Sequence, residues 1–358
     1  MLTPGSYEWS DALLPAIVAM VLLILPGFVP LTLLGLRPTV AAAAAPALST
    51  GIVVMAGSAA AAANRPWTAA MLVLGITVVW LVAGVAWFAL RAARGRRRPR
   101  TGPGATPAVR RPPSEVEGPP WATATALLLG TVAAALIVGF VLTRSADSPE
   151  EFPQHPDTIF HLGVTQWMAE NQDISYQHGT AFARGPVTSG YPIGLHSMAA
   201  SVALFTDTPA VVAISAVVLV TAGVIWPFSM GVVARIAFGG AAAGAVGAVT
   251  SVLFIAFPFM LMGFGVLWAN LYGQALLPGV LAIGLAVTAG LAPNLGSTDP
   301  VRRNLLAAAV CLPGLALAHP QAVITGAVFV AAAALVAAAR RLRAPEGTPW
   351  RRLPMAFI

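Results

Sequence analysis

The chain alternates long apolar runs with short polar breaks, a pattern typical of helices that cross a membrane repeatedly. A helix needs about 20 mainly apolar residues to span the hydrocarbon core of a bilayer. The pattern therefore predicts an all-α, polytopic transmembrane helical bundle of about nine spans. The expected spans lie near residues 12–35, 40–63, 68–90, 121–142, 209–230, 240–262, 275–291, 304–318 and 321–339.

Two long polar segments divide these runs into regions. Residues 91–120 are rich in Arg, Pro and Gly, which predicts a disordered basic loop. A three-span region, residues 1–90, precedes the loop, and a membrane core, residues 121–358, follows it and is expected to continue beyond residue 358. Inside the core, residues 143–208 form a polar loop that holds four of the five histidines. The apolar stretch 191–205 in this loop is too short for an ordinary span, which predicts an interfacial or re-entrant helix.

The composition agrees with a membrane protein. The chain is 58% hydrophobic and 9% charged, whereas soluble domains carry about 25% charged residues. The net charge of +7 does not indicate a nucleic-acid partner, because the arginines lie in short loops beside apolar spans. Cys311 is the single cysteine and lies in an apolar run, which excludes a disulfide framework. No Walker, HExxH or GxSxG motif is present.

The arginines also predict an orientation, because positively charged loops tend to stay in the cytoplasm. If the 91–120 loop is cytoplasmic, the N-terminus and the 143–208 loop lie outside a multi-pass plasma-membrane protein. Only Arg65, Arg144 and Arg184 of the 20 arginines are then external. The same arrangement places all five histidines on the outer face.

The sequence His155-Pro156-Asp157 opens a predicted helix in the external loop. The carboxylate of Asp157 suits either of two roles, a helix N-cap or a general base. His161 follows four residues later and therefore shares a helical face with Asp157. Such a pair can bind a divalent cation, or the histidine can orient the carboxylate. The apolar residues between and after them are expected to rest on the bilayer.

Further polar residues stand at helix ends on the predicted outer face. Tyr191 and His196 flank a Pro and Gly break, and Arg184 is the arginine in the middle of the external loop. Asn270 and Gln274 have amide groups that suit sugar hydroxyls, and a polar break such as His319 at membrane depth usually lines a cavity. The candidate substrate-binding residues are therefore His155, Arg184, Tyr191, His196, Asn270, Gln274 and His319.

The order of these features resembles the GT-C class of membrane glycosyltransferases over about residues 121–290. The matching pieces are Asp157 in HPDTIFHLGV, the acids Glu170 and Asp173, the segment YPIGLHSMAASVALF and the span that begins at PAVVAISAVV. In that class a first external loop carries an acidic residue early in an interfacial helix. A second interfacial helix and a descending span follow.

The resemblance implies a transferase that moves a sugar from a polyprenyl-phosphate donor to a cell-envelope glycan or lipid acceptor on the outer face. Asp157 would be the general base, His161 a second catalytic residue, and a histidine would stabilise the phosphate. No cofactor is certain, and a divalent cation at Asp157 and His161 stays open. The alternatives are a transporter or flippase for a lipid or small solute, and a non-catalytic cell-envelope assembly protein. Ionisable residues are nearly absent from the spans, which counts against coupled transport.

Overall fold

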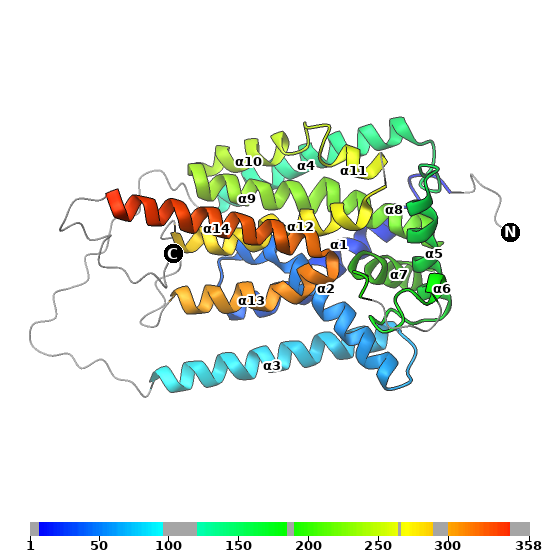
Figure 1. The fold of residues 1–358 in the computed structure, drawn as a ribbon, viewed down its shortest axis with the longest axis horizontal. Coiled ribbons are helices and arrows are strands. Elements are labelled where there is room, and N and C mark those ends of the chain that lie inside the picture. The colour runs from blue at the N-terminus through cyan, green and yellow to red at the C-terminus, as the bar shows by residue number, and fades with distance from the viewer. Residues whose placement is uncertain (1–6, 96–119, 185–189, 264–265, 289–299, 344–358) are drawn as a thin grey trace, which may run out of the picture.

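A computed structural model describes residues 7–95, 120–184, 190–263, 266–288 and 300–343 of the chain (Figure 1). These residues form helices and contain no strand. The helices are α1 (Leu13–Leu33), α2 (Pro38–Ala62), α3 (Ala69–Gly95), α4 (Pro120–Ser145), α5 (Pro156–Glu170), α6 (Ala181–Arg184), α7 (Gly194–Thr206), α8 (Ala210–Val220), the π-helical turn η1 (Thr221–Ile225), α9 (Trp226–Phe238), α10 (Gly240–Thr250), α11 (Phe259–Gly263), α12 (Trp268–Thr288), α13 (Pro300–Ala318) and α14 (Pro320–Arg343).

Six helical segments in the described residues are long and apolar enough to cross a membrane. They are Leu13–Leu33, Pro38–Ala62, Ala69–Ala89, Trp121–Ser145, Ala210–Phe238 and Trp268–Ala286. The prediction of an all-α membrane protein is therefore confirmed, whereas the count of about nine spans is not. Of the predicted basic loop, residues 96–119 lie outside the described part of the chain.

The predicted span 240–262 is wrong as a continuous helix. Helix α10 ends at Thr250, and the short helix α11 begins only at Phe259. Pro258 lies between them and has no backbone N–H to continue a helical ladder, and it disfavours helical geometry at the residue before it. The predicted spans 304–318 and 321–339 correspond to α13 and α14. The apolar part of α14, Pro320–Val336, is shorter than the six segments above.

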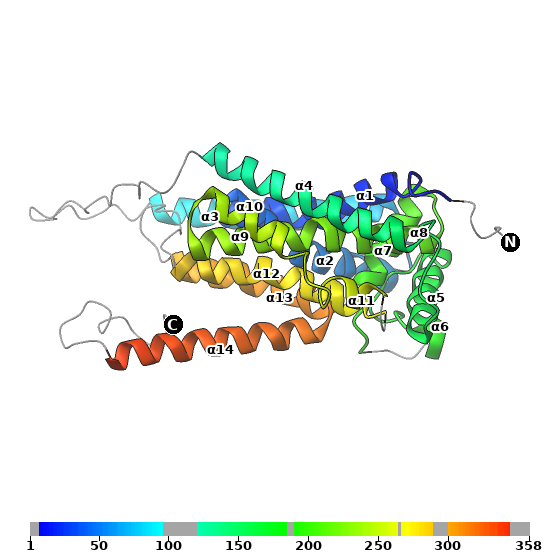
Figure 2. The same ribbon diagram turned by 90° about the horizontal axis from the view of Figure 1, so that it is seen from above.

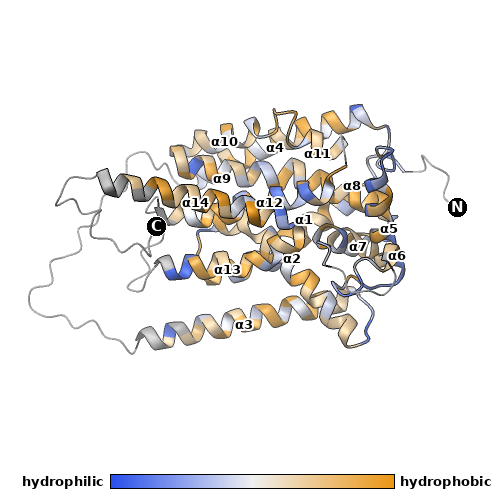
Figure 3. Ribbon diagram, viewed as in Figure 1, coloured by the Kyte–Doolittle hydropathy of each residue, from blue (hydrophilic) through white to orange (hydrophobic). Residues whose placement is uncertain are grey.

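The long helices lie roughly along one axis, and α5 runs across one end of the bundle (Figures 1 and 2). The loop that carries α5, α6 and the start of α7 covers this end, which we call the loop end. All five histidines belong to it, since His319 joins α13 to α14 at the same end. Figure 3 shows hydrophilic residues gathered in this loop and apolar residues along the bundle.

Helix α2 packs at the centre of the bundle, because its small side chains let neighbouring backbones approach closely. It contacts α1, α12 and α13. A Cβ atom on Gly314 or Gly279 would collide with the carbonyl oxygens of Ala47 and Ala43 in α2. Close approach of small residues is the usual way in which membrane helices associate without a hydrophobic driving force.

The same centre satisfies the backbone groups that prolines leave open. Pro30 in α1 cannot donate to the carbonyl of Pro26, and the Trp80 indole donates to that oxygen instead, at 3.0 Å. The amide of Gly27 donates to Ser49 Oγ at 2.9 Å. Unsatisfied backbone groups are costly in a membrane, and side chains of neighbouring helices commonly pair with them.

Helix α7 enters the bundle, and its residues Gly194 to Ala203 are all buried. The prediction of a short helix here is confirmed, and the choice between an interfacial and a re-entrant helix stays a prediction. The apolar face of α5 also packs on protein, with Val164 buried and α7 and α8 as neighbours. The expectation that this face rests on the bilayer is therefore wrong at Val164, whereas Ile159 is 66% exposed and the expectation there stays a prediction.

Candidate functional site

Two of the predicted residues form a direct pair at the loop end. His161 of α5 and His196 of α7 approach to 2.9 Å between Nδ1 and Nε2. Their exposed fractions are 4% and 0%. The i,i+4 spacing indicated Asp157 and His161 as a pair, but the ring that His161 contacts belongs to His196 in the buried helix α7. The structure therefore brings together two histidines that are 35 residues apart.

Aromatic rings enclose this histidine pair. Trp268 of α12 stacks on His161 with ring centroids 5.9 Å apart and planes at 26°. Tyr191 lies 5.8 Å from His196, and Phe160 meets Tyr191 edge to face at 4.9 Å. We use the name aromatic enclosure for the set of five residues His161, His196, Trp268, Tyr191 and Phe160. Neither Phe160 nor Trp268 was among the candidate site residues, so the sequence analysis missed their place in the site.

Burial makes the aromatic enclosure electrically neutral near pH 7. Desolvation lowers the pKa of His161 to about 4, although Asp157 opposes this shift. Burial, with a smaller effect from His161, holds the pKa of His196 well below its ordinary value. Burial and then the charge of Asp157 raise the pKa of Tyr191 to about 12. Both imidazoles and the phenol are therefore uncharged, because a low-dielectric site disfavours the charged forms.

Asp157 stands at the rim of this neutral enclosure. Its side chain is 53% exposed, and its charge acts on both His161 and Tyr191. The N-cap of α5 is His155, whose Nδ1 accepts a hydrogen bond of 3.3 Å from the backbone N–H of Asp157. The alternative that Asp157 caps the helix is therefore wrong, because a histidine ring performs that task. The Asp157 carboxylate lies 3.7 Å from His155 Nδ1 and stays accessible.

The cap at His155 recurs at His319. Nδ1 of His319 accepts a hydrogen bond of 3.2 Å from the backbone N–H of Gln321 at the start of α14. Each histidine precedes a proline, and Pro156 and Pro320 both occupy the first helical position, where a missing N–H costs nothing. A repeated His-Pro step was the sequence signal for this cap. His319 also acts electrostatically on His161, which places it near the enclosure.

The hydrogen bonds of Gln274 lead to Asn270 and Thr325, outside the enclosure. Gln274 Nε2 donates to Thr325 Oγ1 at 3.2 Å and approaches Asn270 Oδ1 at 3.5 Å, so these amides link α12 to α14. Arg184 ends α6, and its side chain lies outside the described part of the structure. Within the described residues, no group of three or more His, Cys, Asp or Glu residues could hold a metal ion.

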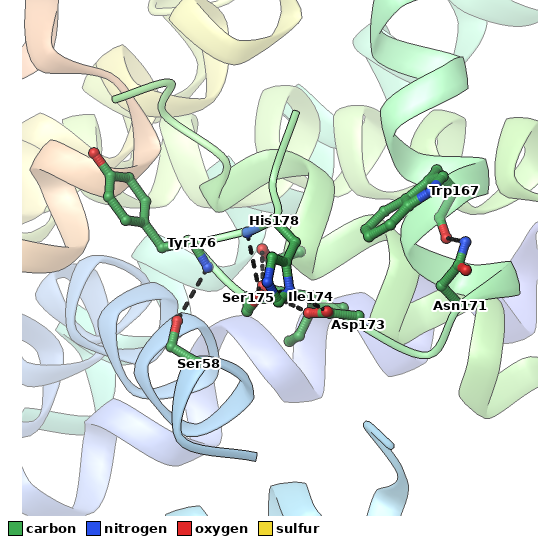
Figure 4. Close-up of polar contacts among 9 residues, drawn as sticks. Ser58, Trp167, Asn171, Asp173, Ile174, Ser175, Tyr176 and His178 are labelled. Atoms are coloured by element: carbon green, nitrogen blue, oxygen red, sulfur yellow. Dashed lines mark hydrogen bonds and ion pairs between the residues drawn. The ribbon is translucent and has the colours of Figure 1, made fainter. Parts of the chain in front are cut away.

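A second pair, between His178 and Asp173, lies in the loop after α5 (Figure 4). His178 Nδ1 donates to Asp173 Oδ2 at 2.6 Å, and the other carboxylate oxygen accepts the Ser175 N–H at 2.9 Å. The backbone of this loop is bound to the bundle, since Tyr176 N–H donates to Ser58 Oγ and Ser197 Oγ–H donates to the Ile174 carbonyl, both at 3.0 Å. These contacts hold the loop against α2 and α7.

Comparison with known proteins identifies a family. The model described as "Family of unknown function (DUF6541)" matches residues 20–358 of the chain. Neither a curated protein nor a solved structure matches the chain.

Proposed function

We propose that this protein, which belongs to the DUF6541 family, is a membrane glycosyltransferase that takes its sugar from a polyprenyl-phosphate donor. The observation that carries the proposal is the position of Asp157. Its carboxylate is accessible, and it does not cap helix α5 because His155 does so. It borders the neutral enclosure of aromatic and imidazole rings. A free carboxylate beside a half-buried aromatic site suits a base that acts on a sugar or alcohol hydroxyl.

The reaction needs one base and accurate positioning. The acceptor hydroxyl loses its proton to the Asp157 carboxylate while its oxygen bonds to the anomeric carbon. The bond from that carbon to the lipid phosphate breaks, and the phosphate leaves with the bonding electrons. Because a lipid phosphate is already a stable leaving group, positioning and general-base catalysis supply most of what the protein must contribute.

The outer helices support a lipid-linked donor. Exposed apolar side chains cover α3, α4 and α14, as at Phe88, Phe140 and Phe329. The site itself lies at one end of the same bundle, where a polyprenyl chain in the bilayer and a hydrophilic acceptor outside it can meet. We propose that this end faces the outside of the plasma membrane and that the acceptor is a cell-envelope glycan or lipid.

The test replaces Asp157 by Asn in the full-length protein. We expect the variant to lose about 10²–10⁴-fold in the rate of sugar transfer, because Asn has a similar shape but no basic oxygen. The measurement follows radiolabelled sugar from synthetic polyprenyl-phosphate hexoses and pentoses into envelope acceptors in membrane vesicles. Asp147→Asn is the matched control, since Asp147 is an exposed acid in the same external loop, and it should keep wild-type transfer.

Two outcomes would overturn the proposal. The first is full transfer activity in Asp157→Asn. The second is wild-type vesicles that move a lipid or a solute across the bilayer and transfer no sugar, which would favour the transporter. The melting temperature of Asp157→Asn should match the wild type, because the backbone N–H that His155 caps is unchanged.

A cysteine-labelling experiment tests the orientation. Gln177 is exposed at the loop end and Ala237 is exposed at the opposite end of α9. In intact cells, Gln177→Cys should react with an impermeant maleimide and Ala237→Cys should react only after permeabilisation. The native Cys311 is buried and should stay unlabelled. Labelling of Ala237→Cys alone in intact cells would reverse the proposed topology.

A further inference from the structure

One ring nitrogen in the aromatic enclosure has no hydrogen-bond partner. His196 is fully buried, and its Nδ1 atom is unpaired, although its Nε2 contacts His161. Two nearby buried hydroxyls are paired. Thr50 Oγ1 lies 2.6 Å from the Tyr272 hydroxyl, and Ser201 Oγ accepts a hydrogen bond from Trp67. Thr180 Oγ1 and Thr221 Oγ1 are buried and unpaired as well, but His196 Nδ1 is the unpaired atom inside the aromatic enclosure, and an unpaired polar atom is costly at such a depth.

The hydrogen bonds around His161 decide whether this nitrogen is a donor or an acceptor. His161 has a backbone hydrogen bond with Val266 that favours the protonated ring, so the Val266 carbonyl is the acceptor. A neutral imidazole has only one N–H. Nδ1 of His161 faces His196 Nε2 at 2.9 Å, which leaves Nε2 of His161 as the nitrogen that donates to Val266. With its one N–H at Nε2, His161 accepts at Nδ1 from His196 Nε2–H. The single N–H of His196 is thus used, and its Nδ1 carries a bare lone pair.

The backbone at Val266, next to this histidine pair, is unusual. Val266 has a φ of 48°, in the left-handed region that a β-branched residue rarely adopts. Such strained conformations concentrate at functional sites, where surrounding contacts maintain them. Here the conformation accompanies the hydrogen bond between Val266 and the buried ring of His161.

The lone pair on His196 Nδ1 favours a ligand group that donates a hydrogen bond and disfavours an anion. A phosphate offers oxygen acceptors near pH 7, which would face the lone pair of His196 and the nearby charge of Asp157. Burial of an anion that faces a lone pair and a carboxylate is strongly unfavourable. A hydroxyl group, in contrast, can donate to His196 Nδ1 while the apolar face of a sugar ring packs on Phe160, Tyr191 or Trp268.

We propose that His196 Nδ1 accepts a hydrogen bond from a hydroxyl group of the sugar, and that the lipid phosphate binds outside the aromatic enclosure. This inference rests on the proposed function. It revises the expectation that His161 or His196 stabilises the phosphate. Phe160 and Tyr191 are partly exposed and contact the ring of His196, so a sugar reaches the nitrogen by displacing them.

The experiment uses full-length protein with ¹⁵N-labelled histidine in lipid nanodiscs, where long-range ¹H–¹⁵N correlation assigns the tautomers. In the ligand-free protein His161 and His196 should carry the proton on Nε2. His178 should carry it on Nδ1, because it donates from there to Asp173. A panel of methyl hexosides and methyl pentosides should shift the His196 Nδ1 resonance, and methyl phosphate at the same concentration should not. His178 is the internal control and should not move.

Any of three results would overturn the inference: a proton on His196 Nδ1 in the ligand-free protein, a shift with methyl phosphate alone, or no shift with the whole glycoside panel. A second measurement compares glycoside binding to His196→Phe and His178→Phe by saturation transfer. His196→Phe should weaken binding about two- to tenfold, which corresponds to the loss of one hydrogen bond, and His178→Phe should leave binding unchanged.

The result is separable from that of the transfer assay. Asp157→Asn should retain the glycoside shift at His196, because it leaves the histidine pair in place. If no sugar transfer is found while the glycosides still shift His196, the proposed reaction fails and the sugar site stands. If transfer is found and His196 does not respond, only the inference about this nitrogen fails.

Discussion

Two pairs of side chains at the loop end, His161 with His196 and His178 with Asp173, use histidine in opposite ways. His161 and His196 are buried and bond to each other, whereas His178 is 43% exposed and bonds to the carboxylate of Asp173, itself 20% exposed. Both pairs lie beside α7. The difference shows that the environment of a histidine, more than its position in the sequence, separates a candidate ligand-binding group from a group that holds a loop in place.

The physical reason is the balance of hydrogen bonds in each pair. The Asp173 carboxylate accepts from His178 and from the Ser175 backbone, so this pair closes a local turn. The buried pair has an imidazole in place of the carboxylate, and one nitrogen stays unpaired. The paired Nδ1 of His178, in a side chain that is 43% exposed, gains little from a ligand. The buried, unpaired Nδ1 of His196 gains most, because a ligand would supply its missing hydrogen bond.

The largest expected effect on stability comes from acidification. The pKa of His161 is about 4 in the folded protein and near 6.5 when unfolded, so the unfolded state binds protons more readily. The free energy of unfolding should therefore fall as pH drops from 6.5 towards 4, by about 3 kcal/mol for His161 alone. Denaturant unfolding in detergent at several pH values measures it. A stability that rises on acidification would contradict a neutral buried pair.

A smaller loss is expected when one ring of the buried pair is removed. His161→Phe keeps an aromatic ring beneath Trp268 but leaves the N–H of His196 without its acceptor. We expect this to cost about 1–3 kcal/mol at pH 7, the usual price of a buried unsatisfied donor. The variant should also depend less on pH than the wild type, because it lacks a titrating group. An unchanged pH profile would show that His161 does not titrate as the structure implies.

The smallest effect is expected in the exposed pair. Asp173→Asn keeps an oxygen for the Ser175 backbone N–H and loses the charge that faces His178. Partly exposed ion pairs contribute about 0–1 kcal/mol, so the free energy of unfolding should change by less than about 1 kcal/mol. The same denaturation assay at pH 7 measures it. A loss as large as that of His161→Phe would remove the distinction between the two pairs.

The sequence by itself determined the fold class and the end of the bundle at which the candidate residues gather. Apolar runs of membrane length require helices, because backbone groups in a bilayer must be satisfied within the chain. The separation of polar loops from apolar runs likewise placed all five histidines at one end of the bundle. The boundaries failed at Pro258, where a continuous apolar run conceals a break in the helix.

The tertiary structure decided which candidate residues meet. The spacing of Asp157 and His161 indicated a shared helical face, but it could not show that His155 caps the helix or that His196 reaches His161 from α7. The second fact depends on a short helix that packs inside the bundle. Hydrophobicity reports that a segment leaves water, and it does not distinguish lipid from protein as the destination. Packing against α1, α2 and α8 made that choice for α7, and with it placed His196 in the site.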